Sequence, residues 1–499
     1  MSIARSIGIS LSFVGLLVGA GFASGQEVMQ YFVSFGSSGI WGMLLAGSIM
    51  AVAGTVFLQL GSYFQASEHN VVFSSVAHPV VSKFLDFSVV VTLFSIGFVM
   101  LAGAGSNLEQ QWGFPTWVGS ALMLILVLAC GMLDVDKVSR VIGGITPLII
   151  IAVLVVGIYS LLHLPGNFGE VFQVAEAMES PLPNWWISAL NYSGLALILA
   201  VSMSLVIGGD NLNPQEAGLG GLLGGIMYAL LMAVATFSLL VNINIVGNAD
   251  MPLLAVVNEI HPILGIIMAI IIYLMIFNTA IGMFYALGRR LSARKPENYR
   301  QIFIIGCLAG FAISFAGFKV LMQYVYPVLG YIGIALIIVL MVAWLRGFSQ
   351  IKEEAQRRAR VRALLSLRLR PDRHYTAENA EELGAIMQES NLEDEELFDT
   401  ALNEVSQSLD SDGEVHFSLD EFESDEYQVE ELTDTTSFVS EEDLPDEALV
   451  EEDEQLGGEE IHSAEYHMTD AQGQVVEFTV HGEPERGQVP VADSNKEKF

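Results

Sequence analysis

Residues 15–27 read Gly-Leu-Leu-Val-Gly-Ala-Gly-Phe-Ala-Ser-Gly-Gln-Glu, inside the first long apolar stretch of the chain. Each glycine in a helix interior is unfavourable by about 1 kcal/mol relative to alanine. In hydrocarbon, irregular backbone persists only where it is buried in protein or lines a cavity, because freed backbone groups need partners. We therefore predict a broken membrane helix beside a binding site, an arrangement typical of transporters. The alternative is a continuous helix whose glycines serve close helix packing, since they include pairs with four-residue spacing.

The composition divides the chain into a membrane core and an acidic tail. The chain is 52% hydrophobic with a mean hydropathy of +0.51, which is typical of a protein with several membrane spans. Residues 1–345 hold ten Lys or Arg and fourteen Asp or Glu, whereas residues 346–499 hold twelve and forty-two. We predict a transmembrane core over 1–345, a basic amphipathic juxtamembrane helix over 346–373, and an acidic, mostly disordered cytoplasmic tail over 374–499. Neither half has the basic face that binding to nucleic acid requires.

Ten apolar segments reach or approach the roughly 20 residues that a membrane helix needs. They are residues 6–33, 38–63, 84–108, 114–133, 140–162, 185–208, 217–245, 262–288, 301–318 and 320–345. With the N-terminus inside, nine of the ten basic residues of the core fall in cytoplasmic loops, and only Lys319 lies outside. The positive-inside rule requires such a bias. We therefore expect an all-α, multi-pass protein of the lipid bilayer with both termini in the cytoplasm.

Ten spans divide into two sets of five. Because five is odd, a second set that repeats the first must enter the membrane from the opposite side, which gives a 5+5 inverted repeat. The first span then corresponds to the sixth, which contains Asn191-Tyr192-Ser193-Gly194 within an apolar run. We predict that helices 1 and 6 are both discontinuous and meet at a midplane binding site. Alternatively, Asn191 and Ser193 hydrogen-bond a neighbouring helix.

The first break resembles that of a known family. Val-Gly-Ala-Gly-Phe at 18–22 and Ala-Ser-Gly-Gln-Glu at 23–27 resemble the YkvI-like bacterial membrane proteins, which are similar to the amino acid–polyamine–organocation transporters of the LeuT fold. The resemblance covers about residues 1–345 and implies a location in the bacterial cell (inner) membrane. It also implies that a small solute binds between the unwound parts of helices 1 and 6.

Carried onto this chain, the resemblance assigns a substrate cradle and an ion site. The substrate cradle is Gly19, Ala20, Gly21, Tyr192, Ser193 and Gly194, with Ser24 as a weaker member. The sodium site is the carbonyls of Gly15 and Val18 with the side chains of Asn278 and Thr279. Asn278 departs from the family's usual pair of hydroxyl residues. No cofactor is expected beyond sodium or a proton as coupling ion.

Glu27 is the first acidic residue of the chain, and it follows the break directly. Buried carboxylates in membrane spans are rare and usually functional, so we predict that Glu27 carries a proton or provides the counter-charge for a cationic solute or ion. Gln26 is expected to share this polar environment. The alternative places Glu27 near the outer headgroups, where a carboxylate is easily solvated.

The tail carries two patterns. Seven arginines from residue 357 onward, interleaved with leucines, predict a helix that binds anionic lipids at residues 357–373; an extended positive-inside signal is the alternative. Residues 374–499 hold thirty-nine acidic and three basic side chains, a composition typical of disorder. Within them, 461–481 resembles a weak hairpin, because Tyr466 and a Val475–Val480 run flank Gln472-Gly473-Gln474.

These features favour a secondary active transporter of a small polar solute, an amino acid or related amine, coupled to sodium or protons by alternating access. The alternative is a non-transporting membrane sensor or scaffold that signals through its acidic tail. The sequence contains no Gly-x-x-x-x-Gly-Lys phosphate loop and no His-Glu-x-x-His or Gly-x-Ser-x-Gly motif, so we do not expect an enzyme. The oligomeric state stays open.

Overall fold

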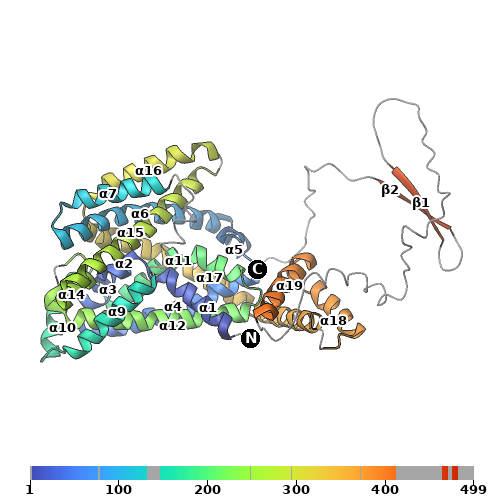
Figure 1. Ribbon diagram of the computed structural model, residues 1–499, viewed down its shortest axis with the longest axis horizontal. Helices are drawn as coiled ribbons and strands as arrows, with labels where there is room; N and C mark the ends of the chain where they lie inside the picture. Colours follow the sequence, from blue (N-terminus) through green and yellow to red (C-terminus); the bar gives the residue numbers. More distant parts are fainter. Residues whose placement is uncertain are drawn as a thin grey trace. The chain divides into compact units, whose positions relative to one another are not determined.

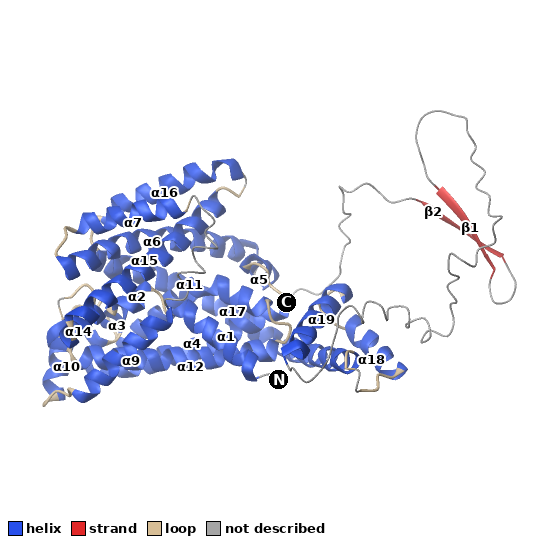
Figure 2. Ribbon diagram, viewed as in Figure 1, coloured by secondary structure: helices blue, strands red, loops and turns tan. Residues whose placement is uncertain are grey.

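The computed structural model describes residues 3–76, 79–131, 146–247, 249–293, 295–370, 373–411, 463–469 and 475–481. The chain divides into two compact units, Met1–Phe417 with Phe499, and Ser418–Lys498. The described part of the first unit contains helices and their connections, and that of the second contains two strands (Figure 2).

The first apolar stretch forms three helices in place of one. α1 (Ile3–Leu17) ends before Val18, α2 (Ala20–Ser24) is a single turn, and α3 (Gln26–Tyr31) follows a turn at Gly25. A short 3-10 helix, η1 (Val33–Phe35), then leads into α4. The predicted break of the first span is therefore confirmed.

Each of the other nine predicted spans corresponds to a long helix of the described residues. These are α4 (Gly36–Tyr63), α6 (Pro79–Trp112), α7 (Thr116–Cys130), α9 (Thr146–Leu162), α11 (Trp185–Gly209), α12 (Pro214–Val241), α15 (Pro262–Leu291), α16 (Tyr299–Ser314) and α17 (Phe318–Arg368). Six stretches of the described residues are long and apolar enough to cross a membrane, and three shorter apolar helices accompany them. The connections include α5 (His69–Val76), α10 (Phe168–Glu176), α13 (Ile243–Val246), α14 (Pro252–Ile260) and η2 (Pro296–Asn298).

The helices pack in two groups, one of α1, α4, α11 and α12 and the other of α6, α7, α15 and α16 (Figure 1). The packing repeats itself between the two halves of the chain. The pair α1–α12 has its counterpart in α11–α4, and α6–α7 has its counterpart in α15–α16, while α4 packs on α12 and α6 on α15. This pairing is what two repeated halves of five spans would produce. Glycines bring the central pair close, since a Cβ on Gly221 of α12 would overlap the Gly54 carbonyl of α4.

The predicted discontinuity of helix 6 is wrong. α11 runs without interruption from Trp185 to Gly209. The polar residues in it have partners: the Ser193 hydroxyl donates to the Ala189 carbonyl at 2.8 Å, and the Asn191 amide donates to the Pro327 carbonyl of α17 at 2.8 Å. A Cβ on Gly194 would overlap the Gly330 carbonyl of α17. Asn191 and Gly194 therefore serve helix–helix contact, which for Asn191 was the alternative interpretation, whereas Ser193 bonds within α11 itself.

The region after the last span differs from the expectation in two ways. First, the basic segment is not a separate helix, because α17 is one helix of 51 residues. Second, the acidic tail begins with two helices, α18 (Ala377–Gln388) and α19 (Asp394–Ser411), both of which contact α17. α19 folds because it buries an apolar stripe with four-residue spacing, made of Leu397, Ala401, Val405 and Leu409.

At least four of the seven arginines assigned to anionic lipids have carboxylate partners within the protein. The ion pairs are Arg357–Glu389, Arg358–Glu354, Arg360–Glu382 and Arg362–Glu216. Protein carboxylates therefore compete with lipid for this face of α17.

The predicted hairpin is confirmed in the second unit. β1 (Ser463–Thr469) pairs antiparallel with β2 (Val475–His481), with Tyr466 opposite Phe478. The prediction of disorder for residues 412–462, 470–474 and 482–499 lies outside the described residues.

Candidate functional site

The break in the first span frees backbone carbonyls. The Val18 amide still donates to the Val14 carbonyl at 2.9 Å, but the Gly19 amide donates to the Leu17 carbonyl, only two residues earlier, at 3.0 Å. In an unbroken helix that amide would bond to the Gly15 carbonyl. Among the described residues, no backbone amide donates to the Val18 carbonyl either. The two carbonyls that the resemblance assigns to sodium, those of Gly15 and Val18, are thus among those that the break releases.

A second turn follows at Gly25, which has a φ of +82°. This left-handed conformation favours glycine because it brings a Cβ too close to the backbone. The site is also crowded, since a Cβ here would lie 2.9 Å from the Leu253 amide nitrogen of α14. The Ser24 hydroxyl stabilises the turn by donating to the Gly21 carbonyl at 2.7 Å and accepting from the Gln26 amide at 3.1 Å.

The turn folds the Glu27 side chain back over α2. A Cβ on Gly21 would overlap the Glu27 carboxylate, so only glycine at position 21 leaves room for it. Glu27 is 9% exposed, and no Lys, Arg or His of the described residues forms an ion pair with it. A carboxylate in such a place is costly unless a cation or a proton neutralises it.

Further polar atoms near the break also lack partners. The side-chain carbonyl oxygens of Gln26 and Gln30, both on α3, are buried without a hydrogen bond, as is the Thr236 hydroxyl of α12. Thr236 lies one turn before Leu239, whose side chain adjoins the turn at Gly25. Buried polar groups without partners are rare, so this cluster indicates a place where a polar guest supplies the missing bonds.

Several aromatic side chains lie near the carboxylate. The Tyr192 and Tyr228 hydroxyls are 2.5 Å apart, and the Tyr192 ring lies 5.4 Å from that of Tyr31 and 5.0 Å from that of Phe32, centroid to centroid. Tyr31, Tyr192, Tyr228 and Tyr326 all lie close enough to Glu27 to interact with its charge. Rings of this kind suit an ammonium group, because their faces are negative.

The structure brings some of the predicted site residues together and separates others. Gly21, Ser24, Gln26 and Glu27 meet at the turn, and Tyr192 lies within range of the Glu27 charge. Ser193 and Gly194 are occupied by contacts of α11 with itself and with α17.

The two remaining ion-site residues lie on α15, which packs against α2. Both Asn278 and Thr279 are partly buried, and the Thr279 hydroxyl donates to the Met275 carbonyl of its own helix at 3.1 Å. Among the described residues, no cluster of three His, Cys, Asp or Glu that could hold a metal ion is present.

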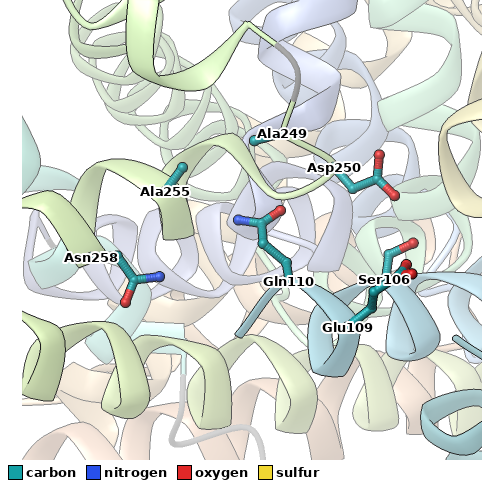
Figure 3. A pocket seen from close by; sticks show the side chains of 7 residues that line it. All are labelled: Ser106, Glu109, Gln110, Ala249, Asp250, Ala255 and Asn258. Atoms are coloured by element: carbon teal, nitrogen blue, oxygen red, sulfur yellow. The ribbon is translucent and has the colours of Figure 1, made fainter. Parts of the chain in front are cut away.

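A cavity of about 530 Å³ lies between the end of α6 and the segment that leads into α14 (Figure 3). Glu109, Asp250 and Ser106 line it together with Gln110 and Asn258. The Gln110 side chain holds Met251 by two bonds, donating to its carbonyl at 2.9 Å and accepting from its amide at 2.8 Å. α14 contributes Ala255 and Asn258 to this cavity and also contacts α2 and α3. It therefore separates the cavity from the break.

Sequence reasoning did not identify Gln30, Tyr31, Tyr228, Tyr326 or Thr236. A signal existed for two of them, since Gln30 and Tyr31 follow Glu27 by three and four residues and so share its helix face. No local pattern distinguishes Tyr228, Tyr326 or Thr236, which reach the site from other helices.

Comparison with known proteins gives consistent results. Residues 215–369 match the family described as "Branched-chain amino acid transport protein". The chain is 27% identical over 333 residues to the uncharacterized membrane protein YkvI of Bacillus subtilis (strain 168), covering 66% of this chain and 93% of that protein. It is 23% identical over 331 residues to YyaD of the same organism, covering 66% and 94%. The resemblance to the YkvI-like family is therefore confirmed.

Two solved structures align with parts of this chain. The inward-facing conformation of Mhp1 aligns with a TM-score of 0.46 at 11% identity, covering 80% of this chain and 88% of that one. MhsT in complex with L-phenylalanine aligns with a TM-score of 0.48 at 16% identity, covering 79% and 98%. The matching transport family and the apolar helices support a membrane transporter.

Proposed function

We propose that this protein is a secondary active transporter of a small polar solute, an amino acid or a related amine, coupled to sodium or protons by alternating access. The observation that carries the proposal is the Glu27 carboxylate. It is buried against a helix break, surrounded by tyrosines, and has no cationic partner among the described residues. A positive charge must therefore arrive with a guest, either an ammonium group, a sodium ion or a proton.

An amine-bearing solute fits the surroundings of this carboxylate. The ammonium group would bond to Glu27 and face the rings of Tyr31 and Tyr192. The buried oxygens of Gln26 and Gln30 accept hydrogen bonds only, so they too suit a donor such as an ammonium group. The matching family, whose description names branched-chain amino acid transport, supports an amino acid as the solute.

The coupling ion has two candidate sites. Sodium would bind the carbonyls of Gly15 and Val18 with Asn278 and Thr279, since hard cations prefer such oxygens. A proton would instead reside on Glu27. In either case an entry route from the cavity beside Glu109 and Asp250 requires α14 to move, because this helix lies between that cavity and the break.

A binding screen tests the site directly. Purified full-length protein is heated in the presence of amino acids and amines while sodium and pH are varied. A solute that binds only the folded state raises the melting temperature. We expect this shift to disappear in Gly21→Leu, whose side chain would displace Glu27, and to persist in Gly8→Leu, where a Cβ meets open space. A shift that survives in Gly21→Leu would contradict the proposed site.

Counterflow separates transport from sensing. Vesicles loaded with unlabelled solute should accumulate the labelled form if the protein exchanges it across the membrane. A sensor or scaffold would bind the solute without exchanging it. We further propose that the N-terminal end of α1 lies in the cytoplasm and that the protein resides in the bacterial inner membrane. The bias of basic residues supports the orientation, and the resemblance supports the location.

A further inference from the structure

The extension of α17 carries an arginine that is fully buried. Arg358 is 0% exposed and donates to the Ser62 carbonyl at 2.8 Å, the Tyr63 carbonyl at 2.9 Å and the Leu212 carbonyl at 3.0 Å. Ser62 and Tyr63 are the last residues of α4, and Leu212 lies between α11 and α12. One guanidinium group thus joins the ends of two spans to the helix that leaves the last span.

The connection between α18 and α19 closes over this arginine. The side-chain oxygen Oδ1 of Asn391 accepts from Arg358 at 2.8 Å, and its side-chain nitrogen Nδ2 donates to the Tyr63 carbonyl at 2.9 Å. The Ser390 hydroxyl donates to Glu354, the ion-pair partner of Arg358, at 2.5 Å. The first helices of the acidic tail are therefore fastened to the membrane core through specific bonds.

Glu404 of α19 forms a second attachment. Its carboxylate accepts from the Leu212 amide at 2.8 Å and pairs with Arg5 of α1 at 2.6 Å and with Arg362 of α17 at 3.4 Å. Arg362 in turn pairs with Glu216 of α12 at 3.0 Å. A single tail carboxylate thereby connects α1, α17 and the α11–α12 connection.

The partners named above that lie outside α17 to α19 belong to one group of helices, namely α1, α4, α12 and the connection from α11. This is the group that contains the break. α1 is separated from the rest of the first span by the irregular residues Val18 and Gly19, so a contact near its N-terminal end holds it independently of α2 and α3. Arg5, near the start of α1, is the point at which the tail holds it.

We propose that residues 351–368 of α17 together with α18 and α19, here called the tail clamp, form an autoinhibitory device. The clamp holds α1 against its neighbours. It thereby keeps closed a route that would lead from the end of α1 at Arg5 to the break. Release of the Glu404–Arg5 contact lets α1 tilt and opens that route. The inference rests on the proposed transport function.

The experiment uses full-length protein in lipid nanodiscs and vesicles, with two readouts. Hydrogen–deuterium exchange of residues 3–17 reports opening at α1, and solute counterflow reports transport. Glu404→Gln and Arg5→Gln each remove the same ion pair from opposite ends. Glu382→Gln is the matched control, because it removes the exposed Arg360–Glu382 pair, which does not reach α1.

We expect Glu404→Gln and Arg5→Gln each to raise both readouts by about fivefold, the effect of losing one partly buried ion pair. The double variant should resemble Glu404→Gln, because that change already removes the ion pair with Arg5 together with the one to Arg362. Glu382→Gln should match the wild type. Unchanged exchange in residues 3–17, or faster exchange throughout the core, would overturn the clamp. If opening at α1 increases as expected but no variant exchanges any solute, the clamp stands and the transport function is wrong.

Discussion

Gly25 determines the direction of the chain after the break. Its φ of +82° is unfavourable for other residues by roughly 1–2 kcal/mol, and a Cβ there would also approach the Leu253 backbone. We expect Gly25→Ala to lower the melting temperature more than Gly113→Ala. Gly113 also has a positive φ, of +71°, but a Cβ at this position meets open space. Thermal unfolding of the two variants measures the difference, and equal losses would show that the contact with α14 contributes nothing.

Glu27 should show opposite effects on stability and on binding. Glu27→Gln keeps the shape of the side chain and removes a buried charge that has no cationic partner among the described residues. The variant should therefore melt at a higher temperature than wild type without solute, since uncompensated charge in the interior is costly. It should also bind the solute at least about tenfold more weakly, because a charge-assisted bond is lost.

Calorimetry with and without solute measures both effects of Glu27→Gln. Glu259→Gln, on an exposed residue of α14, is the control and should change neither. If Glu27→Gln retained full affinity, the carboxylate would not be the anchor of the solute.

The residues of the break could be predicted from the sequence, whereas most of the side chains that other helices contribute around Glu27 could not. Three glycines and a carboxylate within an apolar run are a local signal, because each is unfavourable in a continuous membrane helix. Tyr228 and Tyr326 reach the site from α12 and α17, and nothing near them in the sequence records this. Their contribution depends on tertiary packing alone.

At the scale of the helix, α11 shows how the same residue types serve a different purpose. Asn191, Ser193 and Gly194 resemble an interruption in the sequence, but α11 stays continuous because each of them has a partner. Tyr31 donates to the Asn191 side chain at 3.2 Å, and Gly194 allows α17 to approach. A helix break and a close helix–helix contact both require small and polar residues. The residue types alone therefore did not distinguish the two.

Gly194 provides a test of this interpretation. Gly194→Ala would force α11 and α17 apart, because the added Cβ overlaps the Gly330 carbonyl, and overpacking of this kind destabilises by about 1–3 kcal/mol. Gly282→Ala, in the interior of α15 with open space around it, should instead be neutral or stabilising by up to about 1 kcal/mol. The melting temperatures of the two variants test whether α11 and α17 are in close contact at Gly194. If Gly194→Ala were harmless, α11 would have room to unwind as first predicted.

At the scale of the whole molecule, the spans and their repeated pairing could be predicted from the sequence, whereas the tail clamp could not. Ten apolar segments and the bias of basic residues define the order of spans, because membranes impose length and charge rules on the chain. The tail clamp was not predicted, because the net charge of residues 374–499 is typical of disorder. The stripe of Leu397, Ala401, Val405 and Leu409 was a local signal for α19, but the partners of Glu404 on this helix, Arg5 and Leu212, lie far away in the sequence.

A second polar network joins the two groups of helices at the level of α5. The Nδ1 atom of His69 lies 2.6 Å from the Ser202 hydroxyl of α11. Its Nε2 atom lies 2.8 Å from the Arg290 guanidinium group of α15. Arg290 also pairs with Asp86 of α6 at 2.6 Å. A guanidinium group only donates, so Nε2 must accept and the imidazole is neutral, with its proton on Nδ1. One histidine therefore connects the group containing the break to the group containing α6 and α15.

This network makes the stability of the protein depend on pH. Burial, and then the charge of Arg290, lower the pKa of His69, while Asp86 and Glu68 act in the opposite direction. Because the pKa in the folded protein lies below that of an unfolded histidine, the unfolded chain takes up a proton first as the pH falls through about 6.5. The contribution of His69 is thus fully present above that pH and is lost below it. We expect the melting temperature to fall by a few degrees between about pH 7.5 and pH 5.5.

His69→Gln tests the origin of that slope, because glutamine bonds to both neighbours without titrating. The variant should show a clearly smaller fall in melting temperature over the same pH range. His163→Gln is the control, since His163 lies in the exposed connection after α9 and bonds only to the Tyr159 carbonyl, and it should keep the wild-type slope. If His69→Gln retained the full slope, protonation would act elsewhere, and the neutral imidazole would not be what holds α5 between the two groups of helices.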